Sequence, residues 1–205
     1  PEDHLAKIPA NITFEAAAAS TLAALTALQV LQGKITKEDK VLIHAGSGGV
    51  GHFAIQIAKS LGAYVISTSS AANREFIISL GADQHIDYRQ EAFQDVLSEI
   101  DFVFDMLDGE VLYNSIQVVK AGGTVVSITT REFSVETQEL ATQKGVNLAI
   151  YMVQSSGRDM TTIARMLKNG TIKPHISQVF KFDEMGKAHQ QLESGRTVGK
   201  VVVTV

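Results

Sequence analysis

The stretch that decides the fold is Val41-Leu42-Ile43-His44-Ala45-Gly46-Ser47-Gly48-Gly49-Val50-Gly51. Val41–Ala45 is a short apolar run of the kind that forms a buried strand. The next six residues match the pattern G-x-G-x-x-G. One helical face then follows, made by Val50, Ala54, Ile57, Ala58 and Leu61. A strand, a glycine-rich turn and a helix in this order predict a binding site for a phosphate-containing ligand.

The three glycines of the pattern each have a physical role in such a turn. Gly46 is expected to permit the tight turn, Gly48 to let a diphosphate approach the backbone, and Gly51 to allow the helix to pack closely on the strand. The first turn of the helix adds free N–H groups and a positive dipole end. We therefore predict that a dinucleotide contacts the whole turn, Gly46, Ser47, Gly48, Gly49, Val50 and Gly51.

Outward from this turn, strands and helices alternate. Six runs predict strands: Val41–Ala45, Tyr64–Thr68, Gln84–Asp87, Phe102–Asp105, Thr124–Ile128 and Val146–Ile150. Helical stretches between them include Asn73–Leu80, stopped by Gly81, and Gly109–Lys120, stopped by Gly122. Alternation at this length implies right-handed crossovers and a parallel sheet covered on both faces. The sequence therefore predicts an α/β fold with a doubly wound, six-stranded parallel sheet of the Rossmann type.

The two ends of the chain do not belong to this alternation. A buried helix is predicted over Ala16–Leu31, before the first strand, and another helix over Ser155–Lys168, after the last. Beyond Gly170 we expect a strand over His175–Phe180, a short helix over Asp183–Glu193 capped by Asp183, and a final apolar strand over Gly199–Val205. These last elements are expected to form a separate piece.

The choice of cofactor depends on the end of the second strand. An NAD enzyme usually places Asp or Glu there, whereas the run Ile66-Ser67-Thr68-Ser69-Ser70 contains no acid. A carboxylate would repel a 2′-phosphate, and small hydroxyl groups can donate hydrogen bonds to one. We therefore predict NADPH as the cofactor, with its 2′-phosphate near Ser69, Ser70, Asn73 and Arg74. The alternative for Arg74 is a solvated helix residue. S-adenosylmethionine-binding folds share the turn, but their ribose usually requires an acid too.

Composition excludes several classes of protein. The 205 residues carry a net charge of -4, which gives no reason to expect a nucleic acid or membrane-surface partner. We expect no apolar run to approach the roughly 20 residues that are needed to span a bilayer. The absence of cysteine excludes disulfides and thiolate metal sites within this stretch, and it agrees with a reducing compartment such as the cytoplasm.

Several separated motifs resemble the medium-chain dehydrogenase/reductase superfamily, and in particular its zinc-independent quinone oxidoreductase branch, which includes zeta-crystallin. They are Ala45–Gly51, Gln56-Ile57-Ala58-Lys59, Leu80-Gly81-Ala82-Asp83, Ile86-Asp87-Tyr88 and Gly199-Lys200-Val201-Val202, together with Ala23-Ala24-Leu25-Thr26-Ala27. In that superfamily a GroES-like substrate domain precedes the nucleotide domain, and the chain returns to it at its end. The resemblance therefore implies three parts: an initial segment and linker helix over 1–34, a dinucleotide-binding Rossmann domain over 35–172, and the C-terminal piece of a GroES-like domain over 173–205. The bulk of that domain would precede Pro1, where no initiator Met stands.

The resemblance also assigns roles to individual positions. Ser69 and Tyr88 match residues beside the adenosine 2′-phosphate, although the Lys of some relatives is replaced here by Ala72-Asn73-Arg74. Met106-Leu107-Asp108-Gly109 resembles the segment that lines the adenine and ribose, so Leu107 and Asp108 are expected there. The segments that contact the nicotinamide correspond to Ile128, Thr129, Tyr151 and Met152. Relatives are often homodimers that pair edge strands, for which Val146–Ile150 is the candidate.

The activity that the resemblance implies is hydride transfer from NADPH to a quinone or an α,β-unsaturated carbonyl, without zinc. Where zinc-dependent relatives carry a ligand before the Thr of the first helix, this chain has Ser20-Thr21-Leu22, and its six histidines are scattered. No residue is assigned as catalytic. Tyr-x-x-x-Lys, which short-chain dehydrogenases need, is absent. The alternative to an enzyme is a non-catalytic NADPH-binding sensor or structural protein.

Overall fold

A computed structural model describes residues 1–205. Its main sheet has six strands, all parallel, in the order β3-β2-β1-β4-β5-β6. The strands are β1 (Lys40–Ile43), β2 (Tyr64–Ser69), β3 (Gln84–Asp87), β4 (Ile100–Asp105), β5 (Val119–Ser127) and β6 (Asn147–Ile150). This order, with its reversal between β1 and β4, confirms the predicted doubly wound Rossmann sheet.

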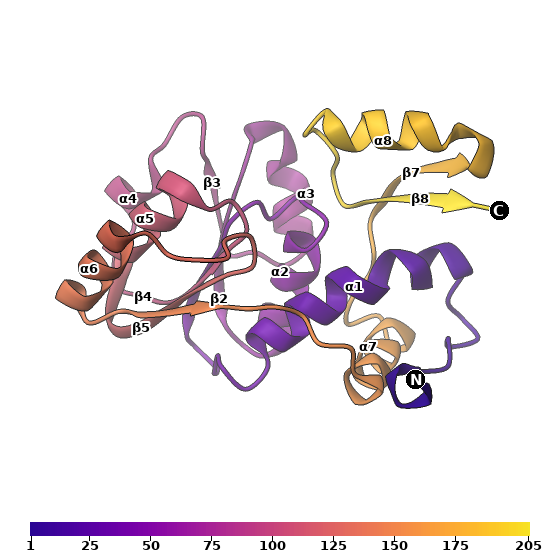
Figure 1. The fold of residues 1–205 in the computed structure, drawn as a ribbon, viewed down its shortest axis with the longest axis horizontal. Helices are drawn as coiled ribbons and strands as arrows, with labels where there is room; N and C mark the ends of the chain where they lie inside the picture. Colours follow the sequence, from indigo (N-terminus) through magenta and orange to yellow (C-terminus); the bar gives the residue numbers. More distant parts are fainter.

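Helices cover both faces of this sheet (Figure 1). One face carries α1 (Phe14–Leu31), α2 (Gly51–Ser60), α3 (Arg74–Ser79) and α7 (Gly157–Lys168); the other carries α4 (Phe93–Val96), α5 (Gly109–Val118) and α6 (Val135–Lys144). Alternate residues of each strand enter the two cores. In β1, Val41 and Ile43 belong to the larger core and Leu42 to the smaller one.

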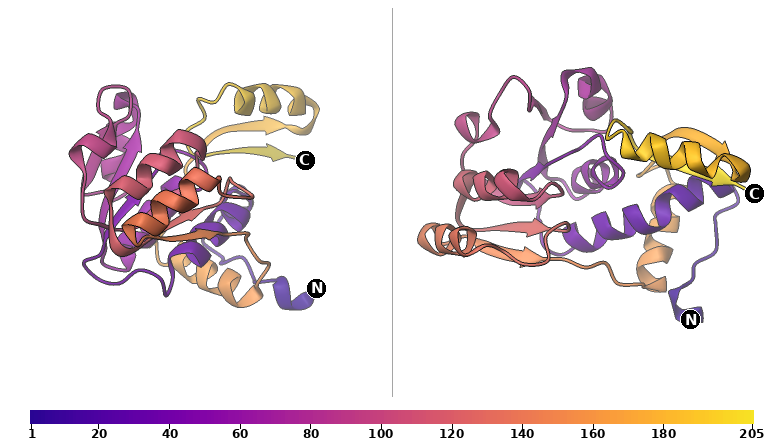
Figure 2. Two further views of the ribbon diagram at one scale, coloured as in Figure 1. Left: turned by 60° about the vertical axis from the view of Figure 1, so that its left-hand side comes forward. Right: turned by 45° about the horizontal axis from the view of Figure 1, so that its top comes forward.

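The C-terminal residues form a second, smaller layer. After α7 the chain passes into β7 (Ile176–Lys181), α8 (Met185–Glu193) and β8 (Lys200–Thr204), and β7 and β8 pair in parallel as a two-stranded sheet. Figure 2 shows this C-terminal unit, in yellow, beside one end of α1 and apart from the six-stranded sheet. The C-terminal strands therefore lie outside the six-stranded sheet.

The structure corrects several details of the sequence-based elements. Two helices, α4 and α6, were not predicted, and β5 begins five residues earlier than expected, at Val119. A helical turn at Phe182–Glu184 precedes α8, whose N-cap is Glu184 rather than Asp183. β1 ends before Ala45, because Ala45 takes a left-handed conformation with φ of 49° that strand pairing does not allow.

The helix α1 is longer than the predicted Ala16–Leu31, because the Thr13 side chain caps it by accepting the N–H of Ala16. At 18 residues and a mean hydropathy of 1.4, α1 is long and apolar enough to cross a membrane by length and composition alone, which corrects the expectation that no apolar run approaches that length. More than half of the helix is buried inside the protein. Helices in the core of a folded domain pass the same test.

Candidate functional site

The glycine-rich turn lies between β1 and α2 at the carboxyl edge of the sheet. Gly46 N–H donates to the carbonyl of Thr68 at 3.0 Å, and Gly48 N–H donates to that of Ala45 at 2.9 Å. The N–H groups of Gly49 and Val50 donate to no acceptor within the protein. These two free donors, at the start of a ten-residue helix, can bind an anionic oxygen.

Two glycines of the turn are required by packing. A Cβ at Gly51 would overlap the carbonyl oxygen of Ala45 and lie 2.7 Å from Gly46 Cα, as expected for close contact of helix and strand. A Cβ at Gly46 would collide with the side chains of Ser67, Ile55 and Ile77. Gly46 has no positive φ, so its role is close packing, and the unusual backbone of the turn belongs to Ala45 instead.

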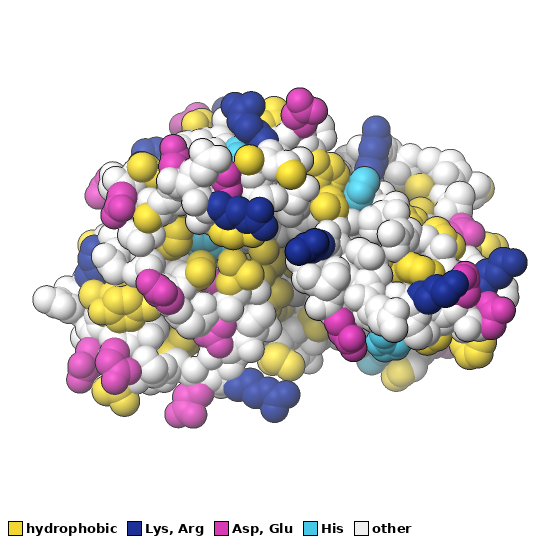
Figure 3. All heavy atoms as spheres, turned by 90° about the horizontal axis from the view of Figure 1, so that it is seen from above, with side chains coloured by type: hydrophobic (Ala, Val, Ile, Leu, Met, Phe, Trp, Pro, Cys, Tyr) yellow, Lys and Arg dark blue, Asp and Glu magenta, His cyan; other side chains and the backbone are white.

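A cleft of about 1120 Å³ opens from this turn. Figure 3 looks down on that side of the molecule, where Lys and Arg side chains flank a hollow between the six-stranded sheet and the C-terminal unit. Seven of the residues predicted to bind the cofactor line the cleft: Ser47, Gly48, Ser69, Ser70, Asn73, Tyr88 and Leu107. The cleft therefore joins the glycine-rich turn to the ends of β2 and β3 and to the loop after β4.

The end of β2 supplies Ser69 and Ser70 to the lining of this cleft and no acid. Ser69 Oγ lies 2.8 Å from His85 Nε2 on β3 and donates to the carbonyl of Ser70 at 3.1 Å. Asn73 Nδ2 donates to Ser47 Oγ at 3.1 Å, which connects the β2 loop to the glycine-rich turn. Burial lowers the pKa of His85, and the positive charge of Arg74 lowers it further, against the opposing charges of Asp87 and Glu91.

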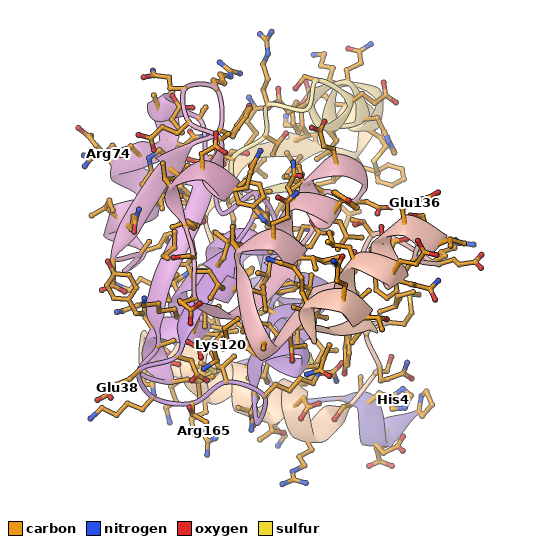
Figure 4. All side chains as sticks on the ribbon, turned by 90° about the vertical axis from the view of Figure 1, so that its left-hand side faces the viewer. His4, Glu38, Arg74, Lys120, Glu136 and Arg165 are labelled. Carbon is orange, nitrogen blue, oxygen red and sulfur yellow. The ribbon has the colours of Figure 1, made fainter.

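The positively charged residues that line the cleft do not include Arg74, which the sequence predicted for the 2′-phosphate. Arg74 is exposed at the start of α3 and is not part of the lining; Figure 4 shows it at the edge of the molecule, at the end opposite to Arg165. Arg89 and Arg196 line the cleft instead. Arg89 packs over the ring of Tyr88 with its guanidinium carbon 5.6 Å from the ring centre. Arg89 directly follows the Tyr88 that the motif identified, so sequence position could have suggested it, whereas Arg196 comes from the distant C-terminal unit.

At the bottom of the cleft lies His44, which is fully buried. Its Nδ1 lies 3.1 Å from Thr68 Oγ1, and its Nε2 lies 2.9 Å from Ser115 Oγ. Because Ser115 donates its hydroxyl hydrogen to the carbonyl of Val111, Nε2 carries the imidazole proton. Burial lowers the pKa of His44 to about 3, so the ring is neutral at physiological pH and adds no positive charge.

The remaining predicted positions lie around the cleft without lining it. Asp108 begins α5 with φ of 64°, and Thr129 is exposed after β5. The Tyr151 side chain points to α1, where its hydroxyl donates to Gln29 Oε1 at 3.3 Å and Lys34 Nζ lies 4.2 Å from its ring centre. Tyr151 therefore could reach a ligand at the cleft through its backbone only. Ile128 packs on the larger core, and the side chain of Met152 is exposed.

The C-terminal unit contacts the glycine-rich turn directly. Gly199 N–H donates to the carbonyl of Ser47 at 2.8 Å. His52, on α2, connects the same two regions: its Nδ1 lies 2.8 Å from the carbonyl oxygen of Gly48, and its Nε2 accepts the N–H of His175 at 3.3 Å. These bonds attach the return segment of the chain to the backbone that would face a diphosphate.

The residues of this chain do not fit a zinc site. Nowhere in residues 1–205 do three or more His, Cys, Asp or Glu side chains come close enough to hold a metal ion. Ser20 and Thr21, at the position where a ligand was sought, instead donate their hydroxyls to the carbonyls of Ala16 and Ala18 within α1.

Residues 80–203 match the family described as zinc-binding dehydrogenase. The chain is 36% identical, over 201 residues, to the 2-methylene-furan-3-one reductase of Solanum lycopersicum, covering 95% of the chain and 48% of that protein. The chain thus spans about half the length of this relative.

Solved structures show the same likeness. The quinone oxidoreductase from Coxiella burnetii superposes with a TM-score of 0.92 at 36% identity, covering 98% of this chain and 63% of that one. The Escherichia coli quinone oxidoreductase complexed with NADPH superposes with a TM-score of 0.89 at 28% identity, covering 98% and 68%. With its glycine-rich turn, its strand order and this family match, the chain belongs to the zinc-binding dehydrogenase family within the medium-chain dehydrogenase/reductase superfamily.

Proposed function

We propose that the protein is an NADPH-dependent, zinc-independent oxidoreductase that transfers hydride to a quinone or an α,β-unsaturated carbonyl. The observation that carries this proposal is the cleft, which is lined by Ser47 and Gly48 of the glycine-rich turn, by an acid-free β2 end and by two arginines. The free N–H groups of Gly49 and Val50 belong to the same turn, beside the residues that line the cleft. Arg89 and Arg196 offer positive charge to the additional phosphate of such a dinucleotide, in a cleft that Glu91 and Glu110 also line.

The cleft divides into parts that suit different parts of NADPH. Gly49 and Val50 offer their N–H groups to the diphosphate, assisted by the positive end of α2. Ser69, Ser70 and Asn73 surround the space for the adenosine ribose, and Arg89, held over the ring of Tyr88, supplies a positive charge for its 2′-phosphate. Arg74 stays a second candidate for that phosphate, from the exposed side of α3.

The chemistry that the bound dihydronicotinamide supplies is hydride transfer. The residues of this chain bind and orient the cofactor, and we assign none of them as catalytic. Ile128, Thr129, Tyr151 and Met152 are proposed to contact the nicotinamide, through backbone atoms in the case of Tyr151. Quinones and enones suit a site without zinc, because they accept hydride without a strong Lewis acid. The names of the relatives from Coxiella burnetii, Escherichia coli and Solanum lycopersicum support this class of acceptor.

We further propose the division into segment 1–34, nucleotide domain 35–172 and a returning piece of a substrate domain over 173–205. A homodimer is proposed to form through β6, the free edge of the sheet, where Asn147, Ala149 and Ile150 are exposed. A cytoplasmic location rests on the cysteine-free composition alone.

Titration with NADPH and with NADH, followed by cofactor fluorescence, tests the proposal. We expect NADPH to bind at least about tenfold more tightly than NADH, because Arg89 contacts only the former's 2′-phosphate. Arg89→Ala should remove most of this preference while leaving NADH binding unchanged. Arg165→Ala, which removes an exposed arginine far from the cleft on α7, is the matched control and should leave both affinities unchanged.

The same titration compares the two assignments of the phosphate site. If Arg74→Ala loses more of the preference for NADPH than Arg89→Ala does, Arg74 rather than Arg89 binds the 2′-phosphate. Equal binding of NADH and NADPH by the unaltered protein would refute the 2′-phosphate assignment and leave the fold intact. Residues 1–205 alone are expected to show little or no turnover, because the proposed substrate domain is incomplete in them. In the full-length protein, selective NADPH binding without oxidation of NADPH by 1,4-benzoquinone or an enone such as 3-buten-2-one would favour a sensor or structural protein over an enzyme.

A further inference from the structure

A buried carboxyl group at the end of β4 holds the loop that follows it. Asp105 is fully buried, and the proposed hydride transfer does not use it. Its Oδ1 accepts the N–H of Leu107 at 3.2 Å, and its Oδ2 accepts the N–H of Asp108 at 3.1 Å. Leu107 lines the cleft, so Asp105 fixes the backbone of a cleft residue without touching the cleft itself.

The same carboxyl group reaches the loop after β5 through one hydroxyl. Ser127 is paired with Asp105 in the parallel register and is fully buried, and its Oγ donates to Asp105 Oδ2 at 2.9 Å. In turn, Ser127 Oγ accepts the N–H groups of Thr129 and Thr130, each at 3.4 Å. One carboxylate and one hydroxyl therefore connect the backbones of two neighbouring loops.

The loop after β4 needs this support. Asp108 has φ of 64° and ψ of -173°, a conformation that residues other than glycine rarely adopt. An ionised carboxylate is an acceptor only, so Asp105 can satisfy Ser127, Leu107 and Asp108 together. A carboxamide would present an N–H to at least one of these donors. Burial raises the pKa of Asp105 and the charge of Asp108 adds to this, while the three hydrogen bonds oppose the rise.

We propose that Asp105 is a positioning residue for the dinucleotide, with Ser127 as its bridge between the adenosine-side loop at Leu107 and the nicotinamide-side loop at Thr129. This inference rests on the proposed function. Asp105 accepts hydrogen bonds from the adenosine-side loop directly, and it reaches the nicotinamide-side loop through Ser127. Ser127 accepts hydrogen bonds from the nicotinamide-side loop only. We therefore expect Asp105 to affect binding of both halves of the cofactor and Ser127 to affect binding of the nicotinamide half.

That division of roles can be measured with two ligands. NADPH contacts both loops, whereas 2′,5′-ADP carries only the adenosine half. Asp105→Asn should weaken binding of both ligands about tenfold, since it disrupts hydrogen bonds to a charged group. Ser127→Ala should weaken NADPH about fivefold and leave 2′,5′-ADP unchanged. Ser20→Ala, which removes a similarly buried hydroxyl from α1, is the control and should change neither affinity.

Binding by fluorescence and calorimetry, with the melting temperature of each variant, decides the outcome. Loss of both ligands in Ser127→Ala would indicate general loosening of the fold and would overturn the assignment, as would unchanged affinities in Asp105→Asn. If Asp105→Asn does not fold, the split between ligands in Ser127→Ala decides alone. If the unaltered protein binds neither ligand, the proposed function itself fails; if it binds both and the variants match it, only the positioning role fails.

Discussion

The two sheets of the molecule are buried to very different degrees. In β1, Val41, Leu42 and Ile43 are completely inaccessible to solvent, because helices cover both faces of the six-stranded sheet. In β7, Val179 is 54% exposed, and only Val202 of β8 is buried. A two-stranded sheet is marginal by itself. The C-terminal unit is therefore held largely by what it contacts, whereas the larger sheet carries its own core.

The glycine-rich turn lies where these two units meet. Its Ser47 carbonyl accepts the N–H of Gly199 from the C-terminal unit, and its Gly51 packs against the backbone of Ala45 and Gly46, just after β1. One side of the turn is thus fixed by a complete core, and the other by the less buried unit. We expect substitutions on the first side to affect stability and those on the second to affect mainly the site.

The largest expected effect comes from a methyl group at Gly51. In Gly51→Ala the new Cβ would meet the Ala45 carbonyl and Gly46 Cα, which are backbone atoms that cannot move aside. We expect the free energy of unfolding to fall by about 3 kcal/mol. Gly186→Ala on α8 is the matched control: nothing lies within 4 Å of its Cβ, and alanine favours a helix, so stability should stay equal or rise by up to about 1 kcal/mol. Urea unfolding measures both, and similar changes in the two variants would remove the contrast between the units.

Much of the larger sheet was predictable because its signals are local. Most strand cores were identified from a short apolar run, although β3 has only Ile86 as an apolar residue, and the G-x-G-x-x-G pattern placed the turn at the correct edge. Helix α6 was missed because only Thr137 and Ala141 are buried in it, too few to make an apolar face. The sequence marks this helix only at its two ends. The Ser134 side chain caps the start by accepting the N–H of Thr137, and Gly145 ends the helix with φ of 67°.

The residues of the cleft could be predicted from the sequence only where a local motif or a strand end identifies them. Ser69 and Tyr88 lie at strand ends, where parallel topology directs them to the cleft. Arg196 was not predicted, because it reaches the cleft from a loop of the C-terminal unit, and no pattern within the sequence relates that loop to β2. The orientation of Tyr151 depends on Gln29 and Lys34, which belong to the other end of the chain.

An intermediate effect per residue is expected when the pH is lowered. We expect it to destabilise the larger unit, which contains the buried His44 and His52. Burial lowers the pKa of His52 to about 4 and that of His44 to about 3, against about 6.5 in an unfolded chain. Below pH 6.5 the unfolded state therefore binds more protons, and the free energy of unfolding should fall by up to about 1.4 kcal/mol per pH unit for each histidine. Above pH 6.5 the stabilisation from keeping these histidines neutral is fully present. As the pH falls, the free energy of unfolding stops decreasing once the histidines of the folded protein are also protonated.

Unfolding in urea between pH 7.5 and pH 4.5 measures this slope. His52→Gln should make the slope shallower, because a titrating group buried on α2 is removed. His189→Gln, which replaces an exposed histidine on α8, should leave the slope as it is. An unchanged slope in His52→Gln would show that the acid sensitivity arises elsewhere and would leave the two units equivalent in this respect.

The smallest expected difference is between two ion pairs, one in each unit. Lys59 Nζ lies 2.7 Å from Asp83 Oδ2, and the same oxygen accepts the N–H of Val65 at 2.7 Å. Burial raises the pKa of Asp83, but these hydrogen bonds and the charge of Lys59 outweigh it, so the pKa is lowered and the stabilisation is lost as pH falls through the acid range. Asp83→Asn should therefore cost about 1 kcal/mol at pH 7. Glu184→Gln, which breaks the exposed pair with Lys187 beside α8, should cost nothing measurable, because solvent screens it. If both variants lost the same free energy of unfolding, the exposed ion pair of the C-terminal unit would stabilise the protein as much as the partly buried pair of the larger unit does.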